Sequence, residues 1–133
     1  KRQRSIDLGA SDSFDSATDY PAEVDVVIDS IGPAVWRASV AALRPGGRFV
    51  TCGGTSGSEL TLSLPRLFFK QHELIGSTLG SAEEFAYVTR LMAEGLPVVI
   101  DDTLAWSDFP SGVDRIREGS QVGKLVLRHD AAA

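Results

Sequence analysis

Residues 24–54, VDVVIDSIGPAVWRASVAALRPGGRFVTCGG, decide the fold of this chain. They begin with an apolar run, from Val24 to Ile28, that only Asp25 interrupts. Such a run is typical of a strand with both faces covered, which is the environment inside a parallel sheet. The pattern therefore predicts a central parallel strand.

A helix and a second strand are predicted directly after this strand. Pro33 suits a first helical position, and Trp36, Val40 and Leu43 then recur at helical spacing. Residues 45–47, Pro-Gly-Gly, end that helix, and residues 49–52 form the next strand. A strand, a helix and a strand within this span make one crossover unit, so the two strands are expected to be parallel.

The rest of the chain continues the alternation of helices and strands. Before the first crossover unit, the pattern predicts the end of a helix that closes at Gly9 and a strand at 10–14. After it, the pattern predicts an edge strand or extended chain at 59–64, a helical turn at 67–69, a strand at 73–80 and a helix that begins with a Ser81/Glu84 capping box and ends at Gly95. The last predicted elements are a strand or a bent pair of strands at 97–106, a helix at 107–119 and a strand at 123–130. The predicted fold class is α/β.

Composition excludes several classes of function. Thirteen Lys and Arg residues stand against eighteen Asp and Glu residues, and no basic run occurs, so neither a nucleic acid nor a membrane is an expected partner. Cys52 is the only cysteine, which suits a reducing compartment, and no apolar run approaches the ~20 residues of a membrane span. We expect the protein to be cytoplasmic.

Glycine and hydroxyl residues follow three of the predicted strands, at residues 29–32, 52–55 and 76–79. If the strands are parallel neighbours, these ends share one edge of the sheet, where open α/β folds bind ligands. The alternative is that each end is a turn that needs glycine for a positive φ. Both interpretations stay open from the residues alone.

Other candidate groups favour structural roles. The glycines at 53, 54 and 57 match neither G-x-G-x-x-G nor a P-loop. Asp29 is expected to be a buried carboxylate that neighbouring N–H groups satisfy, and Cys52 to be an inert packing residue. His72 and His129 are interpreted as surface residues because no metal-ligand pattern surrounds them. Trp36 and Trp106 are interpreted as core and interface anchors.

The order of these segments resembles the carboxyl-terminal part of the medium-chain dehydrogenase/reductase superfamily, which contains the zinc-type alcohol dehydrogenases and the quinone oxidoreductases. The matching runs are KRQRSIDLGA, VDVVIDSIG, LRPGGRFVTCGGTSG, KQHELIGSTLGSAEEF, LMAEGLPVVID and EGSQVGKLVL. The resemblance implies the second half of a Rossmann-like, doubly wound parallel sheet at residues 1–96. It also implies that residues 97–133 return to complete a GroES-like catalytic domain.

The resemblance also implies a site for NAD or NADP. In it, residues 30–32 approach the ribose on the nicotinamide side, residues 52–55 pass beside the nicotinamide, and the backbone of residues 77–79 holds the carboxamide. Lys1 corresponds to a lysine that meets the 2′-phosphate in NADPH-dependent relatives. The implied cofactor-binding residues are Lys1, Ser30, Ile31, Gly32, Cys52, Gly53, Gly54, Thr55, Ser77, Thr78, Leu79, Gly123 and Lys124.

The family's first βαβ unit, its GroES-like domain and its zinc ligands have no counterpart in these residues. We therefore expect the chain to derive from a longer polypeptide and to be inactive alone, with no catalytic residue of its own. The implied reaction of the longer protein is hydride transfer between nicotinamide and an alcohol, carbonyl, enone or quinone substrate. Zinc is left open for the longer protein, and the implied partners are a small-molecule substrate, the missing amino-terminal portion and a second copy in a homodimer.

Two alternatives belong to other classes. VDVVIDSIG followed by LRPGGRFV also resembles the fourth and fifth strands of methyltransferases that bind S-adenosylmethionine, although the helix and strand that follow have no natural place there. The other alternative is a non-catalytic interaction module in which residues 60–64 or 73–79 pair with another chain across a two-fold axis.

Overall fold

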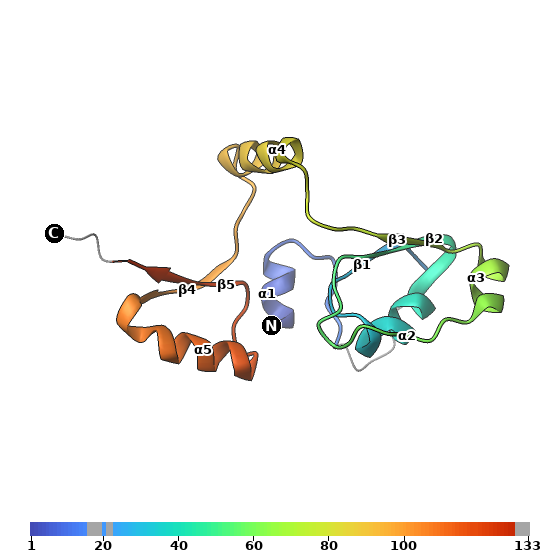
Figure 1. The fold of residues 1–133 in the computed structure, drawn as a ribbon, viewed down its shortest axis with the longest axis horizontal. Helices are drawn as coiled ribbons and strands as arrows, with labels where there is room; N and C mark the ends of the chain where they lie inside the picture. Colours follow the sequence, from blue (N-terminus) through green and yellow to red (C-terminus); the bar gives the residue numbers. More distant parts are fainter. Residues whose placement is uncertain (16–19, 21–22, 130–133) are drawn as a thin grey trace. The chain divides into compact units, whose positions relative to one another are not determined.

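The computed structural model describes residues 1–15, 20 and 23–129. The chain forms two compact units, each of which is considered by itself (Figure 1). The three-stranded unit contains Arg2 and residues 9–79, and the two-stranded unit contains Lys1, residues 3–8 and the residues from Gly80 onward. The proposed boundary between residues 96 and 97 stays a prediction.

The three-stranded unit is a parallel sheet. Its strands are β1 (Val24–Asp29), β2 (Leu43–Thr51) and β3 (Glu73–Gly76), in the order β1-β2-β3. Both neighbouring pairs are parallel, which confirms the expected crossover. In the described sheet β2 is the central strand, so the expectation that residues 24–28 would be central is wrong. β2 also begins at Leu43 instead of Phe49, with an irregular register opposite Val24 and Val26.

Helix α2 (Pro33–Ala42) covers one face of this sheet (Figure 1). Pro33 is at its start, as predicted. Val40, Leu43 and Phe49 form the buried core between helix and sheet, and the ring of Trp36 meets that of Phe49 edge to face with centroids 4.7 Å apart. Trp36 is therefore the core anchor that its helical spacing indicates.

The other face of β1 is exposed. Val27 packs against the core, so the alternating residues Val26 and Ile28 lie on the opposite face. They are 47% and 77% exposed. The expectation that both faces of this strand are covered is thus not met by the described residues, because the helix of this unit covers only one of them.

Two segments in which a strand is predicted, one before β1 and one before helix α3 (Leu64–Lys70), do not form strands. Residues 10–14 do not form the predicted strand: the side chain of Asp12 accepts a hydrogen bond from the backbone N–H of Ser13 at 2.7 Å, a local bond that competes with sheet pairing. Residues 59–63 belong to no sheet, so the predicted edge strand at 59–64 is not formed, and Leu64 already belongs to the following helix. They lead into helix α3 (Leu64–Lys70), where a helical turn is predicted.

The two-stranded unit contains residues 3–8, which belong to the first helix, α1 (Arg2–Asp7), and the elements from Gly80 onward. The latter are α4 (Ala82–Ala93), β4 (Ile100–Ala105), the short 3₁₀ helix η1 (Trp106–Asp108), α5 (Phe109–Glu118) and β5 (Lys124–Arg128). Strands β4 and β5 pair in parallel. Gly9 follows α1 with a φ of 105°, in agreement with its predicted role at the end of a helix. Residues 130–133, the end of the predicted C-terminal segment, lie outside the described residues.

The predicted capping box opens α4. The Ser81 hydroxyl accepts from the backbone N–H of Glu84 at 3.2 Å, and the Glu84 carboxylate accepts from the backbone N–H of Ser81 at 2.6 Å. This second bond is the main reason that the pKa of Glu84 is lowered. None of the helices within the described residues is long and apolar enough to cross a membrane.

Candidate functional site

The ends of the three parallel strands lie at one edge of the sheet. Asp29 pairs with Thr51, and Thr51 pairs with Gly76, so the three strand ends are in register. The residues that follow each strand therefore emerge side by side. This confirms the arrangement on which the predicted site depends.

Asp29 shapes the turn that follows β1. Its carboxylate is buried and accepts hydrogen bonds from the backbone N–H groups of Ile31 and Gly32, both at 2.9 Å. The side chain is thereby occupied, as predicted, and has a structural role. It holds residues 30–32, three of the predicted cofactor-binding residues, in one conformation.

The turn after β2 is hydrogen-bonded to the turn after β1. Thr55 donates its hydroxyl to the carbonyl oxygen of Ser30 at 3.1 Å. Ser56 donates its hydroxyl to the carbonyl oxygen of Ile31 at 2.7 Å and accepts from the backbone N–H of Ala34 at 3.0 Å. The sequence interpretation did not select Ser56, although a hydroxyl next to Thr55 in a glycine-rich turn is the signal that marks it.

Close backbone packing explains two of the glycines in these turns. A Cβ atom on Gly53 would lie 2.9 Å from the carbonyl oxygen of Ser30, and one on Gly54 would lie 2.5 Å from that of Gly57. Neither Gly53 nor Gly54 has a positive φ, whereas Gly32 does, at 91°. At Gly53 the two turns approach each other too closely for a side chain, and at Gly54 the turn after β2 folds back on its own residue Gly57. The positive-φ explanation therefore holds at Gly32 alone among these three.

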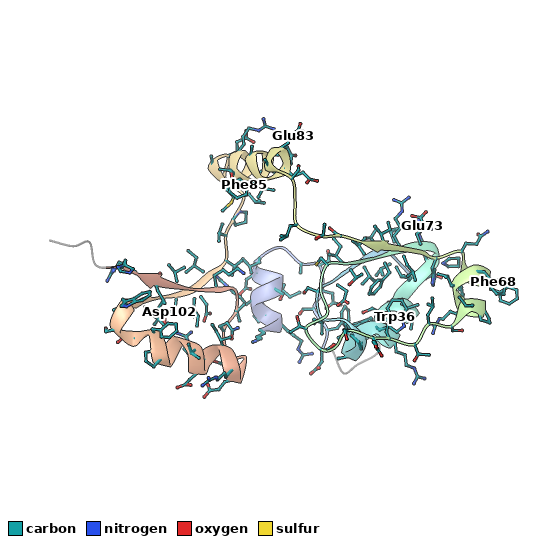
Figure 2. The ribbon with its side chains drawn as sticks, in the orientation of Figure 1. Trp36, Phe68, Glu73, Glu83, Phe85 and Asp102 are labelled. Carbon is teal, nitrogen blue, oxygen red and sulfur yellow. The ribbon has the colours of Figure 1, made fainter. Side chains whose placement is uncertain are left out.

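A cavity of about 570 Å³ lies beside the turns that follow β1 and β2. Gly32, Gly53 and Gly54 of the predicted site line it, and Trp36 and Phe49 supply aromatic walls. Figure 2 shows Trp36 between α2 and the sheet. The volume falls within the ~300–1,000 Å³ typical of small-molecule sites.

The segment after β3 has free backbone groups. Ser77 donates its backbone N–H to the carbonyl oxygen of Thr51 at 2.8 Å, which anchors the start of the segment. Thr78 and Leu79 form no hydrogen bond within the described part of the chain, and Leu79 is 93% exposed. Their N–H and C=O groups are therefore available to a ligand.

Cys52 and His72 differ from their predicted environments. Cys52 is exposed instead of packed, because it lies just past the end of β2, and its backbone N–H donates to the carbonyl oxygen of Asp29 at 2.9 Å. His72 is buried instead of exposed, because Gln71 takes a left-handed conformation that ends α3 and turns the chain inward. His129 is exposed as predicted, with its ring 4.7 Å from that of Trp106.

Three predicted site residues, Lys1, Gly123 and Lys124, belong to the two-stranded unit and are described only within it. Lys124 donates its backbone N–H to the carbonyl oxygen of Val99 at 2.9 Å. Gly123 has a φ of 97°, and a Cβ atom there would collide with that same carbonyl. Backbone packing thus accounts for this glycine as well.

Acidic residues near β4 form an ion-pair cluster instead of a metal site. Arg115 bonds Asp101 at 2.6 Å and Asp102 at 2.7 Å. The hydrogen bond from Arg115, assisted by the backbone N–H of Thr103, lowers the pKa of Asp102. No group of three His, Cys, Asp or Glu side chains that would hold a metal occurs among residues 1–15, 20 and 23–129. These residues therefore do not fit a zinc site.

Comparisons with known proteins place this arrangement in a family. The family model described as zinc-binding dehydrogenase matches residues 4–127. The chain therefore belongs to the zinc-binding dehydrogenases, within the medium-chain dehydrogenase/reductase superfamily. Their α/β fold with a Rossmann-like NAD-binding domain is the one expected from the sequence.

Individual relatives agree with this assignment. A probable quinone oxidoreductase of Schizosaccharomyces pombe is 32% identical over 78% of this chain and 34% of its own length. A cobalt- and zinc-bound thermostable alcohol dehydrogenase from Pyrobaculum aerophilum is 34% identical with a TM-score of 0.74, over 81% of this chain and 33% of that one. An NAD-dependent alcohol dehydrogenase is 28% identical with a TM-score of 0.84, over 98% of this chain and 41% of that one. The chain thus spans about a third of the length of the curated relative.

Proposed function

We propose that this chain supplies the nicotinamide side of an NAD(P) site in an oxidoreductase. The observation that carries the proposal is the register of Asp29, Thr51 and Gly76, which aligns three glycine- and hydroxyl-bearing strand ends beside one cavity. The NAD-dependent alcohol dehydrogenase with the same fold supports the choice of cofactor.

Each turn has its own part in this proposal. Residues 30–32, which Asp29 holds, face the ribose next to the nicotinamide. Residues 52–55 lie beside the nicotinamide ring, where the absence of side chains on Gly53 and Gly54 permits close approach. The free backbone groups of Thr78 and Leu79 pair with the carboxamide. That Lys1, Gly123 and Lys124 also contact the cofactor stays a prediction.

The proposed reaction is hydride transfer between the nicotinamide and an alcohol or carbonyl, or an enone or quinone. When bound, NAD(P) supplies the hydride chemistry, and the protein supplies its position. The residues of this chain orient the ring and limit which of its faces is open. The Asp29 carboxylate has no acid or base role in this proposal, since it is already bonded to the backbone N–H groups of Ile31 and Gly32.

Strand β3 supports a proposed homodimer. Within the described sheet it pairs only with β2, so its second edge has unpaired backbone groups. An unpaired edge is a template for pairing with another strand, and a two-fold axis would bring two copies of β3 together. Light scattering of this chain and of its Leu74→Pro variant tests this, since a dimer of the first and loss of that dimer in the second are the expected results.

Titration with reduced cofactor tests the proposed function. We expect NADH or NADPH to bind the chain saturably, with a change in nicotinamide fluorescence, and S-adenosylmethionine to have no effect. The Gly54→Ala variant should bind more weakly, whereas Lys70→Gln, at an exposed residue of α3 that does not line the cavity, should bind as the unmodified chain does. Stabilisation by S-adenosylmethionine without binding of NAD(P)H would contradict the proposal and favour the methyltransferase alternative.

A further inference from the structure

A second cavity, of about 230 Å³, lies in the three-stranded unit away from the candidate cofactor residues. Its walls come from α2, from α3 with the extended chain before it, and from the start of β3. None of the thirteen predicted cofactor-binding residues lines it. Its volume is below the ~300–1,000 Å³ of sites for drug-sized ligands, so it suits a smaller molecule.

Two cations at this cavity have no acidic partner. Arg37 and Arg66 both line it, and neither forms an ion pair within the described residues. In the same unit, by contrast, Arg44 bonds Asp25 at 2.5 Å and Arg48 bonds Glu73 at 2.7 Å. No Asp or Glu lines the cavity. The lining therefore has a positive charge that an anion would balance, and the guanidinium fork matches a carboxylate in geometry.

A buried histidine adds a polar atom without a partner. His72 is 9% exposed, and its Nε2 has no hydrogen-bond partner in the described structure. Its backbone N–H donates to the carbonyl oxygen of Leu67 at 3.1 Å, which fixes the residue at the end of α3. Because buried polar atoms are almost always paired, this nitrogen indicates a partner that is not part of the chain.

Apolar side chains form the rest of the lining. Trp36 and Val40 contribute from α2, Leu62 and Leu67 from the extended chain and α3, and Leu74 from β3. The indole of Trp36 offers a flat surface on which a ring can stack. The lining therefore combines two cations with an apolar wall, which fits a ligand that has both a negative charge and a compact hydrocarbon body.

We propose that this cavity binds a small carboxylate with a compact apolar body. The guanidinium groups of Arg37 and Arg66 hold the carboxylate, and the apolar body packs against Trp36 and Leu62. Arg37, Arg66 and Leu62 line the second cavity and not the first, whereas Trp36 and Leu74 line both. The proposal requires no bound cofactor, so it stands if the proposed cofactor site fails.

Benzoate is the probe that we would use, with benzyl alcohol and inorganic phosphate as matched controls. Benzyl alcohol keeps the ring without the charge, and phosphate keeps a charge without the ring. In a titration of the ¹⁵N-labelled chain, benzoate should shift the amides of residues 61–64, 66–67 and 72–74 saturably. Equal binding of benzyl alcohol, equal binding of phosphate, or no saturable shift would each overturn the proposal.

Charge-removing variants locate the site. Arg37→Gln and Arg66→Gln should each weaken benzoate binding about tenfold, which corresponds to about 1.4 kcal/mol. Lys70→Gln removes a positive charge from the same helix as Arg66, and because Lys70 does not line the cavity, it should leave binding unchanged. The amide spectrum of each variant reports whether it is folded. Unchanged benzoate binding in a folded Arg66→Gln chain, or an equal loss of benzoate binding in Lys70→Gln, would overturn the proposal. NADH binding, measured in the same samples, reports separately on the cofactor site.

Discussion

The buried carboxylate of Asp29 accepts a hydrogen bond from the backbone N–H of Gly32 at 2.9 Å. This contact, with its counterpart to Ile31, sets the conformation of the first of the three turns that form the candidate site. The carboxylate therefore acts on a ligand only through the backbone that it holds.

Removal of this carboxylate should destabilise the three-stranded unit. Asp29→Ala leaves two backbone N–H groups without an acceptor, so we expect the free energy of unfolding to fall by about 1–3 kcal/mol. Urea denaturation followed by Trp36 fluorescence, in a Trp106→Phe background, measures this change. Asp25→Ala on the same strand is the matched control, because its exposed ion pair with Arg44 contributes only about 0–1 kcal/mol. Equal effects of the two variants would contradict the role given to Asp29.

Addition of one methyl group at Gly54 should also destabilise the site. A Cβ atom there would lie 2.5 Å from the carbonyl oxygen of Gly57, so the turn must move, at an expected cost of about 1–3 kcal/mol. Gly76→Ala is the control, since no atom lies within 4 Å of its added Cβ. Its stability should change by less than about 0.5 kcal/mol. A Gly54→Ala chain as stable as the Gly76→Ala chain would show that Gly54 and Gly57 are not packed as described.

The hydrogen bond from Arg115 lowers the pKa of Asp102 below its ordinary value of 3.8, so this carboxylate binds fewer protons in the folded state than in the unfolded state. Its stabilising contribution is complete above the ordinary pKa and is lost as the pH falls through the lowered folded pKa. Titration of the Asp102 carboxyl carbon by NMR checks the direction of the shift.

In stability measurements between neutral and acid pH, Asp102→Asn should lose part of the pH dependence of the two-stranded unit. Glu118→Gln should retain it, because Glu118 forms no ion pair within the described residues. A pKa of Asp102 at or above its ordinary value would contradict the contact with Arg115.

Ser63 and Ser81, which cap the described helices α3 and α4 through their side chains, should differ in strength. Ser81 belongs to a reciprocal capping box, whereas Ser63 accepts a single bond from the N–H of Arg66 at 3.4 Å. We expect Ser81→Ala to reduce stability within the usual range of about 0.5–2 kcal/mol, and Ser63→Ala to cost less. Helical circular dichroism and amide exchange of α4 measure the difference. A larger loss from Ser63→Ala would reverse the interpretation.

Local patterns in the sequence were enough to predict most of the fold. The start of α2 at Pro33, the capping box at Ser81 and the parallel strands around Asp29 and Thr51 each depend on residues close together in the chain. Whether Val26 and Ile28 are covered depends instead on which elements pack over that face of the sheet. The spacing of apolar residues along the strand does not predict those elements.

The sequence predicted where the candidate site lies, but it predicted only some of the contacts that hold the site together. The alignment of the strand ends follows from parallel pairing, and the satisfied carboxylate of Asp29 follows from its place at a strand end. The hydroxyl bond from Ser56 to Ile31 and the packing of Gly53 against Ser30 arise between segments more than twenty residues apart, whereas Gly54 packs against Gly57 within its own turn. The burial of His72 depends on the left-handed conformation of Gln71, which the residue types around it do not specify.

The central claim is that the three aligned strand ends receive the nicotinamide half of a dinucleotide. Titration of the ¹⁵N-labelled chain with reduced nicotinamide mononucleotide, and separately with adenosine monophosphate, tests it most directly. The account predicts saturable shifts at residues 30–32, 52–56 and 77–79 with the nicotinamide compound and none there with the adenosine compound. Shifts confined to other residues, or the same response to both compounds, would contradict it.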